Sequence, residues 1–95
     1  MLKKPLSTKL VSESVLEALV DSGAIHTVYI VEDNAGDFHV VTRADSYEYQ
    51  IQKKRGGLRS FRDLRRAAEL VRVMGVSRIR LHLNEHKPTV RSVTA

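Results

Sequence analysis

The chain has no cysteine, no tryptophan, only two prolines and only five aromatic side chains among its 95 residues. Without cysteine it can form neither a disulfide framework nor a thiolate metal site. No apolar run approaches the roughly 20 residues that a membrane-spanning helix needs, and the N-terminus lacks the apolar centre of a signal peptide. The composition, 42% hydrophobic and 28% charged, is that of a globular protein. We expect a cytoplasmic protein with a single domain over residues 1–86 and a flexible tail over 87–95.

Positive and negative charges are unevenly distributed along the chain. The formal net charge is +5, yet residues 1–52 carry eight acidic and four basic side chains, whereas residues 53–95 carry twelve basic and three acidic ones. In the densest stretch, residues 53–66, seven of fourteen side chains are basic and one is acidic. This split indicates a polyanionic partner, an acidic protein partner or self-association of the two halves. The alternative is a solvated helix face that arginine keeps soluble.

The first half of the chain predicts one helix followed by three strands. Apolar residues at steps of three and four predict a helix over residues 8–21, with Ser7 as its N-cap and Gly23 at its end. Period-two stretches rich in β-branched and aromatic residues then predict an antiparallel meander of strands, joined by turns. These strands are expected at residues 25–31, 38–42 and 47–51.

The second half predicts one more helix and one more strand. Ser60 is expected to cap a helix that ends at Gly75, and residues 76–83 alternate as a fourth strand. The element order α-β-β-β-α-β predicts an α+β two-layer sandwich, with two helices on one face of a mixed sheet. The crossover helix makes the fourth strand parallel to the third, and it could lie beside either the first or the third strand.

A set of apolar positions from both layers is expected to form the core. Its members lie on the apolar stripe of the second helix and on the strands. Residues from both faces of the first strand are included, because the sequence does not show which face of that strand is buried. The members are Ile25, Val28, Ile30, Val40, Leu64, Ala68, Val71, Ile79 and Leu81.

Candidate catalytic and metal-binding residues are present but do not form a constellation. His82 and His86 are four residues apart, but at a strand end and in coil rather than on a helix, so no metal site is expected. Acidic side chains cluster around the turn near Asp33, where their simpler role is turn formation. The glycine pair Gly56-Gly57 lacks the spacing of a nucleotide-binding loop. We therefore expect no enzyme activity, no cofactor and no small-molecule substrate.

The basic residues carry the main functional signal of the sequence. Arginine outnumbers lysine by nine to three after residue 52, which suits bidentate contacts with phosphate or carboxylate. Base stacking is not expected, because Tyr47 and Tyr49 share a face with Ile51. We also expect Arg78, Arg80 and His82 of the fourth strand to merge with this patch. The candidate site for nucleic acid or an anionic partner consists of Lys53, Lys54, Arg55, Arg59, Arg62, Arg65 and Arg66.

Two family resemblances bear on function. The order α-β-β-β-α with Lys53-Lys54 and a basic second helix resembles the double-stranded RNA-binding domain over residues 8–74, although that family's lysine motif lies at the start of its second helix. The segment Phe61-Arg62-Asp63-Leu64-Arg65-Arg66-Ala67-Ala68, with Lys4-Pro5-Leu6-Ser7-Thr8-Lys9 and the strand from Ile79, resembles small partition-associated proteins of the ParC type. That resemblance implies a non-enzymatic accessory to plasmid or mobile-element segregation with DNA or protein partners. A third possibility is a protein-binding adaptor that dimerises through an exposed strand edge.

Overall fold

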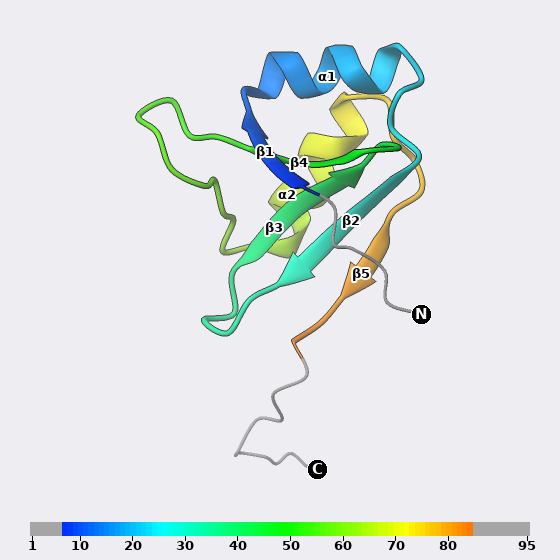
Figure 1. Cartoon of the computed structure of the whole chain (residues 1–95). Coiled ribbons are helices and arrows are strands. Elements are labelled where there is room, and N and C mark those ends of the chain that lie inside the picture. The colour runs from blue at the N-terminus through cyan, green and yellow to red at the C-terminus, as the bar shows by residue number, and fades with distance from the viewer. Residues whose placement is uncertain (1–6, 85–95) are drawn as a thin grey trace, which may run out of the picture.

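The computed structural model describes residues 7–84, which form one mixed sheet and two helices (Figure 1). The sheet order is β1-β4-β3-β2-β5; β3 is antiparallel to β2 and β4, and the two edge strands are parallel to their neighbours. This confirms the predicted α+β class. The predicted tail at residues 87–95 lies outside the described residues. The elements are β1 (Ser7–Val11), α1 (Glu13–Asp21), β2 (Thr27–Glu32), β3 (Phe38–Arg43), β4 (Tyr47–Ile51), α2 (Leu64–Val73) and β5 (Arg80–His82).

Both helices lie on one side of the sheet, as predicted. In Figure 1, α2 lies behind the sheet and α1 runs across its upper end, while no helix covers the face turned to the viewer. Strand register explains the division, because Ile30 pairs with Val40 and both are buried against the helices. Their neighbours Tyr29 and Val41 also pair, so both point to the opposite, uncovered face.

Residues 8–11 form a strand and Ser12 is the N-cap, so the predicted first helix is five residues too long and its N-cap at Ser7 is wrong. The segment pairs in parallel with β4, with Val11 opposite Ile51, and the amide of Gln52 donates to the Val11 carbonyl at 2.8 Å. Helix α1 begins after Ser12, whose hydroxyl accepts from the Val15 amide at 3.2 Å. The helical spacing of Leu10 and Val11 was misleading because their pairing with a strand about 40 residues away decides their conformation.

The second helix begins at Leu64 rather than directly after Ser60. Phe61 is held extended by a two-way bridge with Phe38, with amide-to-carbonyl distances of 2.6 and 2.8 Å. The N-cap is therefore Asp63, whose carboxylate accepts from the Arg65 amide at 2.9 Å. Asp63 thus provides the cap that was predicted at Ser60.

The last strand is much shorter than predicted and pairs in parallel with β2, the first strand of the meander. Strand β1 occupies the edge position beside β4. The last strand therefore joins the sheet at its other edge, beside β2. The crossover through α2 makes β5 run in the same direction as β4, as expected. Because β5 spans only Arg80–His82 at an edge, Leu81 stays 44% exposed and does not belong to the core.

The remaining residues predicted for the core differ in how deeply their side chains are buried. Val28, Ile30, Val40 and Val71 are buried, whereas the other predicted members, apart from Leu81, are only half-buried at the rim. The core prediction did not select several buried residues. They are Leu16 of α1, Ile51 of β4, Ala67 of α2, Met74 at the C-cap of α2 and Phe61 on the bridge before α2.

Candidate anion-binding surface

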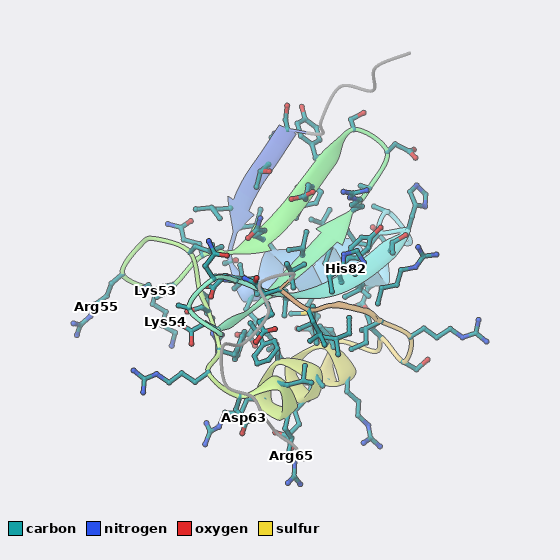
Figure 2. All side chains as sticks on the ribbon, turned by 90° about the horizontal axis from the view of Figure 1, so that it is seen from below. Lys53, Lys54, Arg55, Asp63, Arg65 and His82 are labelled. Carbon is teal, nitrogen blue, oxygen red and sulfur yellow. The ribbon has the colours of Figure 1, made fainter. Side chains whose placement is uncertain are left out.

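The connection from β4 to α2 projects from the body of the protein (Figure 1), and Figure 2 shows three of the candidate residues on it. The Gly56 amide donates to the Lys53 carbonyl at 2.9 Å, and the Lys53 amide donates to the Gly57 carbonyl at 2.8 Å. Both glycines have φ near +90°, a conformation that side chains with a Cβ rarely adopt. This tight turn leaves Lys53, Lys54 and Arg55 exposed.

Three arginines are exposed around the start of α2. Arg62 precedes the N-cap, and Arg65 and Arg66 lie in the first turn. Figure 2 shows Arg65 extending away from the sheet, and its Nε lies 3.5 Å from a carboxylate oxygen of Glu69. The positive end of a helix dipole disfavours cations, so these residues do not stabilise the helix. A bound anion there would gain from both the dipole and the guanidinium groups.

Arg59 differs from the other candidate residues because it is used within the fold. Its Nη1 donates to Oε1 of Glu13 at 2.6 Å, and its Cζ lies 4.8 Å from the centroid of the Phe61 ring. The side chain is half-buried. Arg59 therefore joins the loop to the start of α1, and we do not include it among the freely available cations.

A groove of about 970 Å³ lies between the start of α1 and this loop. Lys53, Lys54 and Arg59 line it from the loop, but Glu13 and Glu17 of α1 line it as well. The mixed charge makes the groove a poor anion site, since an anion there would meet two carboxylates. The better surface is the outward side of the loop tip and of the first turn of α2. We call these residues the basic surface: Lys53, Lys54, Arg55, Arg62, Arg65 and Arg66.

The expected merger with the last strand is wrong for Arg80 and His82. Arg80 pairs in register with Tyr29, so it points to the uncovered face of the sheet, away from α2. His82 shares that face, two residues further along the same strand. Because side chains alternate between the two faces of a strand, Arg80 and His82 lie on the other side of the sheet from the basic surface. Arg78 is exposed on the connection that precedes β5.

Two histidine–aspartate pairs fix the ends of the β2–β3 hairpin. Nε2 of His39 donates to Oδ2 of Asp33 at 2.6 Å, and Nε2 of His26 donates to Oδ1 of Asp45 at 2.6 Å. Asp33 also accepts from two backbone amides of its own turn. The hydrogen bond from His39, with those from the amides, holds the pKa of the Asp33 carboxyl below its ordinary value. These histidines thus have structural partners.

Metal-binding clusters of three or more side chains do not occur within residues 7–84, and His86 of the His82–His86 pair lies outside that range. The described helices are also too short and too polar to cross a membrane. Comparison with known proteins gives no match to any family model, any curated protein or any solved structure.

Proposed function

We propose that this protein is a small, non-enzymatic accessory module of the cytoplasm that docks its basic surface on the phosphate backbone of duplex DNA. The observation that supports this function best is the exposure of Arg62, Arg65 and Arg66 together at the positive end of α2. A role in plasmid partition or mobile-element maintenance is the biological setting that we propose, on the resemblance to ParC-type proteins.

The mode of binding follows from the chemistry of the surface. Guanidinium groups pair with phosphate oxygens through two parallel hydrogen bonds, and the loop lysines add point charges beside them. Contacts to phosphates position a protein on the duplex without reading its sequence. Binding should therefore show little sequence preference and a steep dependence on salt.

The test uses a charge reversal on α2 and a matched reversal elsewhere. Arg62→Glu with Arg66→Glu should weaken duplex DNA binding strongly and flatten the slope of log affinity against log salt by about 0.9 for each lost phosphate contact. Arg72→Glu with Arg78→Glu changes the net charge equally but lies at and beyond the C-terminal end of α2, so it should weaken binding much less. Fluorescence anisotropy between about 50 and 200 mM salt measures both affinities and slopes.

Other results would point to other functions. Equal losses from the two double variants would contradict a localised surface, and tighter binding to duplex RNA than to duplex DNA would favour the RNA-binding alternative. That alternative is weakened by one feature of the fold, because Lys53 and Lys54 lie in the loop and α2 begins only at Leu64. If the wild type binds neither duplex near 50 mM salt, the proposal is wrong, and an acidic protein partner or a merely solvated surface takes its place.

A second candidate function, a homodimeric adaptor, is favoured by the edge of β1. Gln52 bonds to the carbonyl of Val11, so the alternate residues Thr8 and Leu10 direct their backbone groups away from β4. Leu10 is also 44% exposed. Light scattering would show a dimer, and Thr8→Pro should weaken it by removing an outward amide while leaving the β1–β4 ladder intact. A monomeric wild type would exclude this function.

A further inference from the structure

The uncovered face of the sheet presents a continuous row of side chains across all five described strands. Leu10, Gln50, Val41, Tyr29 and Arg80 are successive partners in register from β1 to β5. Val41 at the centre is buried, although no helix covers it, because its cross-strand neighbours enclose it. This row is therefore apolar at Val41 and Tyr29, with Arg80 at one edge of the sheet and Leu10 at the other.

Three planar side chains meet on this face. The ring centroids of Tyr29 and His82 lie 4.9 Å apart with their planes at 76°, and Cζ of Arg43 lies 5.2 Å from the centroid of the Tyr29 ring. They come from three neighbouring strands: β3, β2 and β5. Tyr29 is half-buried between its neighbours, so little side-chain entropy remains to be lost when a ligand packs against it.

The charges around these rings favour an anionic ligand. Arg43 and Arg80 are both exposed on this face, and Arg80 forms no ion pair among the described residues. The carboxylate of Glu48 lies 3.5 Å from Nε of Arg43, and only 20% of its side chain is exposed. Asp33 at the hairpin end is hydrogen-bonded to His39. The exposed charge beside the rings is thus positive.

We infer that the uncovered sheet face binds single-stranded nucleic acid, with bases stacked on Tyr29 and His82 and phosphates contacted by Arg43 and Arg80. Unpaired bases can lie flat on aromatic side chains, whereas the bases of a duplex are already stacked inside it. The inference goes beyond the proposed function, which uses the opposite side of the molecule and the backbone of a duplex. Single-stranded DNA and RNA offer the same stacking chemistry.

The decisive variant is Tyr29→Ala, with Tyr47→Ala as the matched control. Tyr47 belongs to the other face, where its ring lies 4.1 Å from Nζ of Lys9. Affinity for labelled oligothymidylate and oligouridylate, each about 16 nucleotides long, is measured by fluorescence anisotropy. Loss of one stacking contact should weaken binding by about 5- to 150-fold in Tyr29→Ala and leave Tyr47→Ala unchanged. Tyr29→Phe keeps the ring and should bind like the wild type.

A second variant tests the inference at a position where substitution should not disturb folding. His82 is exposed at the sheet edge, so His82→Ala should fold normally and still weaken binding, whereas His26→Ala should not. The two oligonucleotides separate the sources of the ligand: a preference for oligothymidylate indicates DNA, and one for oligouridylate indicates RNA. Backbone amide shifts in NMR titrations should be confined to β2, β3 and β5.

The outcomes separate this inference from the proposed function. If Tyr29→Ala loses the oligonucleotides but keeps duplex binding, and Arg62→Glu with Arg66→Glu does the reverse, two surfaces are established. If the α2 variant alone affects both ligands, or if the wild type binds neither oligonucleotide near 50 mM salt, the inference is wrong while duplex binding can still stand. A wild-type dimer that Tyr29→Ala dissociates, without oligonucleotide binding, would instead assign this face to a second copy of the chain.

Discussion

At the scale of single residues, Leu16 is the side chain that ties α1 to the rest of the protein. It is 0% exposed and belongs to the same cluster as Ile51 and Ala67. Leu16→Ala should lower the free energy of unfolding by about 2–5 kcal/mol, because it leaves a cavity between helix and sheet. Leu81→Ala should cost clearly less, because Leu81 is 44% exposed. Urea denaturation measures both, and equal costs would contradict this description of the core.

Asp33 predicts an acid-sensitive hairpin. Its pKa is lowered in the folded protein, chiefly by the hydrogen bond from His39, so its carboxylate stabilises the fold most above the ordinary Asp value. That contribution is lost as the pH falls below about 4. Asp33→Asn should therefore be less stable than the wild type at pH 7, and the difference should shrink between about pH 4 and 2.

The control for this pH dependence is Asp21→Asn. Asp21 is exposed at the end of α1 and accepts no hydrogen bond from the described residues. Its substitution should change stability little at either pH. A difference between wild type and Asp33→Asn that stays constant from pH 7 down to about 2 would show that the His39 contact does not depend on the carboxylate charge.

At the scale of elements, α2 combines a structural cap with the functional surface. Asp63 caps the helix, and it also places a negative charge among Arg62, Arg65 and Arg66. Asp63→Ala should therefore destabilise the protein by about 1 kcal/mol and strengthen duplex DNA binding. Asp63→Asn keeps a capping oxygen and loses the charge, so it should bind as tightly as Asp63→Ala at nearly full stability.

Thermal unfolding and salt-titrated anisotropy measure the two effects separately. Weaker DNA binding in both Asp63 variants would mean that the arginines need this carboxylate to hold their positions. Unchanged binding in both would remove the first turn of α2 from the proposed DNA-binding surface, since a lost carboxylate amid phosphate contacts must alter the attraction.

At the scale of the whole molecule, the two β-α-β crossovers contribute their strands to the same sheet. The first connects β1 to β2 through α1, the second connects β4 to β5 through α2, and the strands that they add lie at opposite edges. Removing residues 1–11 should expose the edge of β4 and the buried side of Ile51. We expect loss of cooperative unfolding and self-association through the exposed edge.

Size-exclusion chromatography and urea denaturation test this prediction. Lys9→Ala is the control, because it alters an exposed side chain of β1 but keeps the backbone ladder to β4. A truncated chain that stays monomeric and unfolds cooperatively would show that β1 is an appendage rather than part of the folding unit.

Local patterns were sufficient for much of this architecture. Alternation gave the meander at close to its observed limits, because each hairpin pairs neighbouring segments through a short turn. The exposure of Arg65 and Arg66 also followed from sequence, since helical periodicity places them off the apolar stripe that contains Ala67 and Val71, whereas Arg62 precedes the helix. The same reasoning predicted two helices on one face of the sheet, because each helix has a single apolar stripe.

Contacts between distant segments decided the rest. Residues 8–11 became a strand and Phe61 stayed extended because each found a backbone partner far away in sequence, which no local pattern records. The role of Arg59 depends on Glu13, 46 residues before it. The sequence determined that Tyr29 and Arg80 would alternate with apolar neighbours, but only strand register decided that they share the uncovered face. A pleated strand reverses its faces with a shift of one residue, and tertiary packing of α1 and α2 fixed which face is covered.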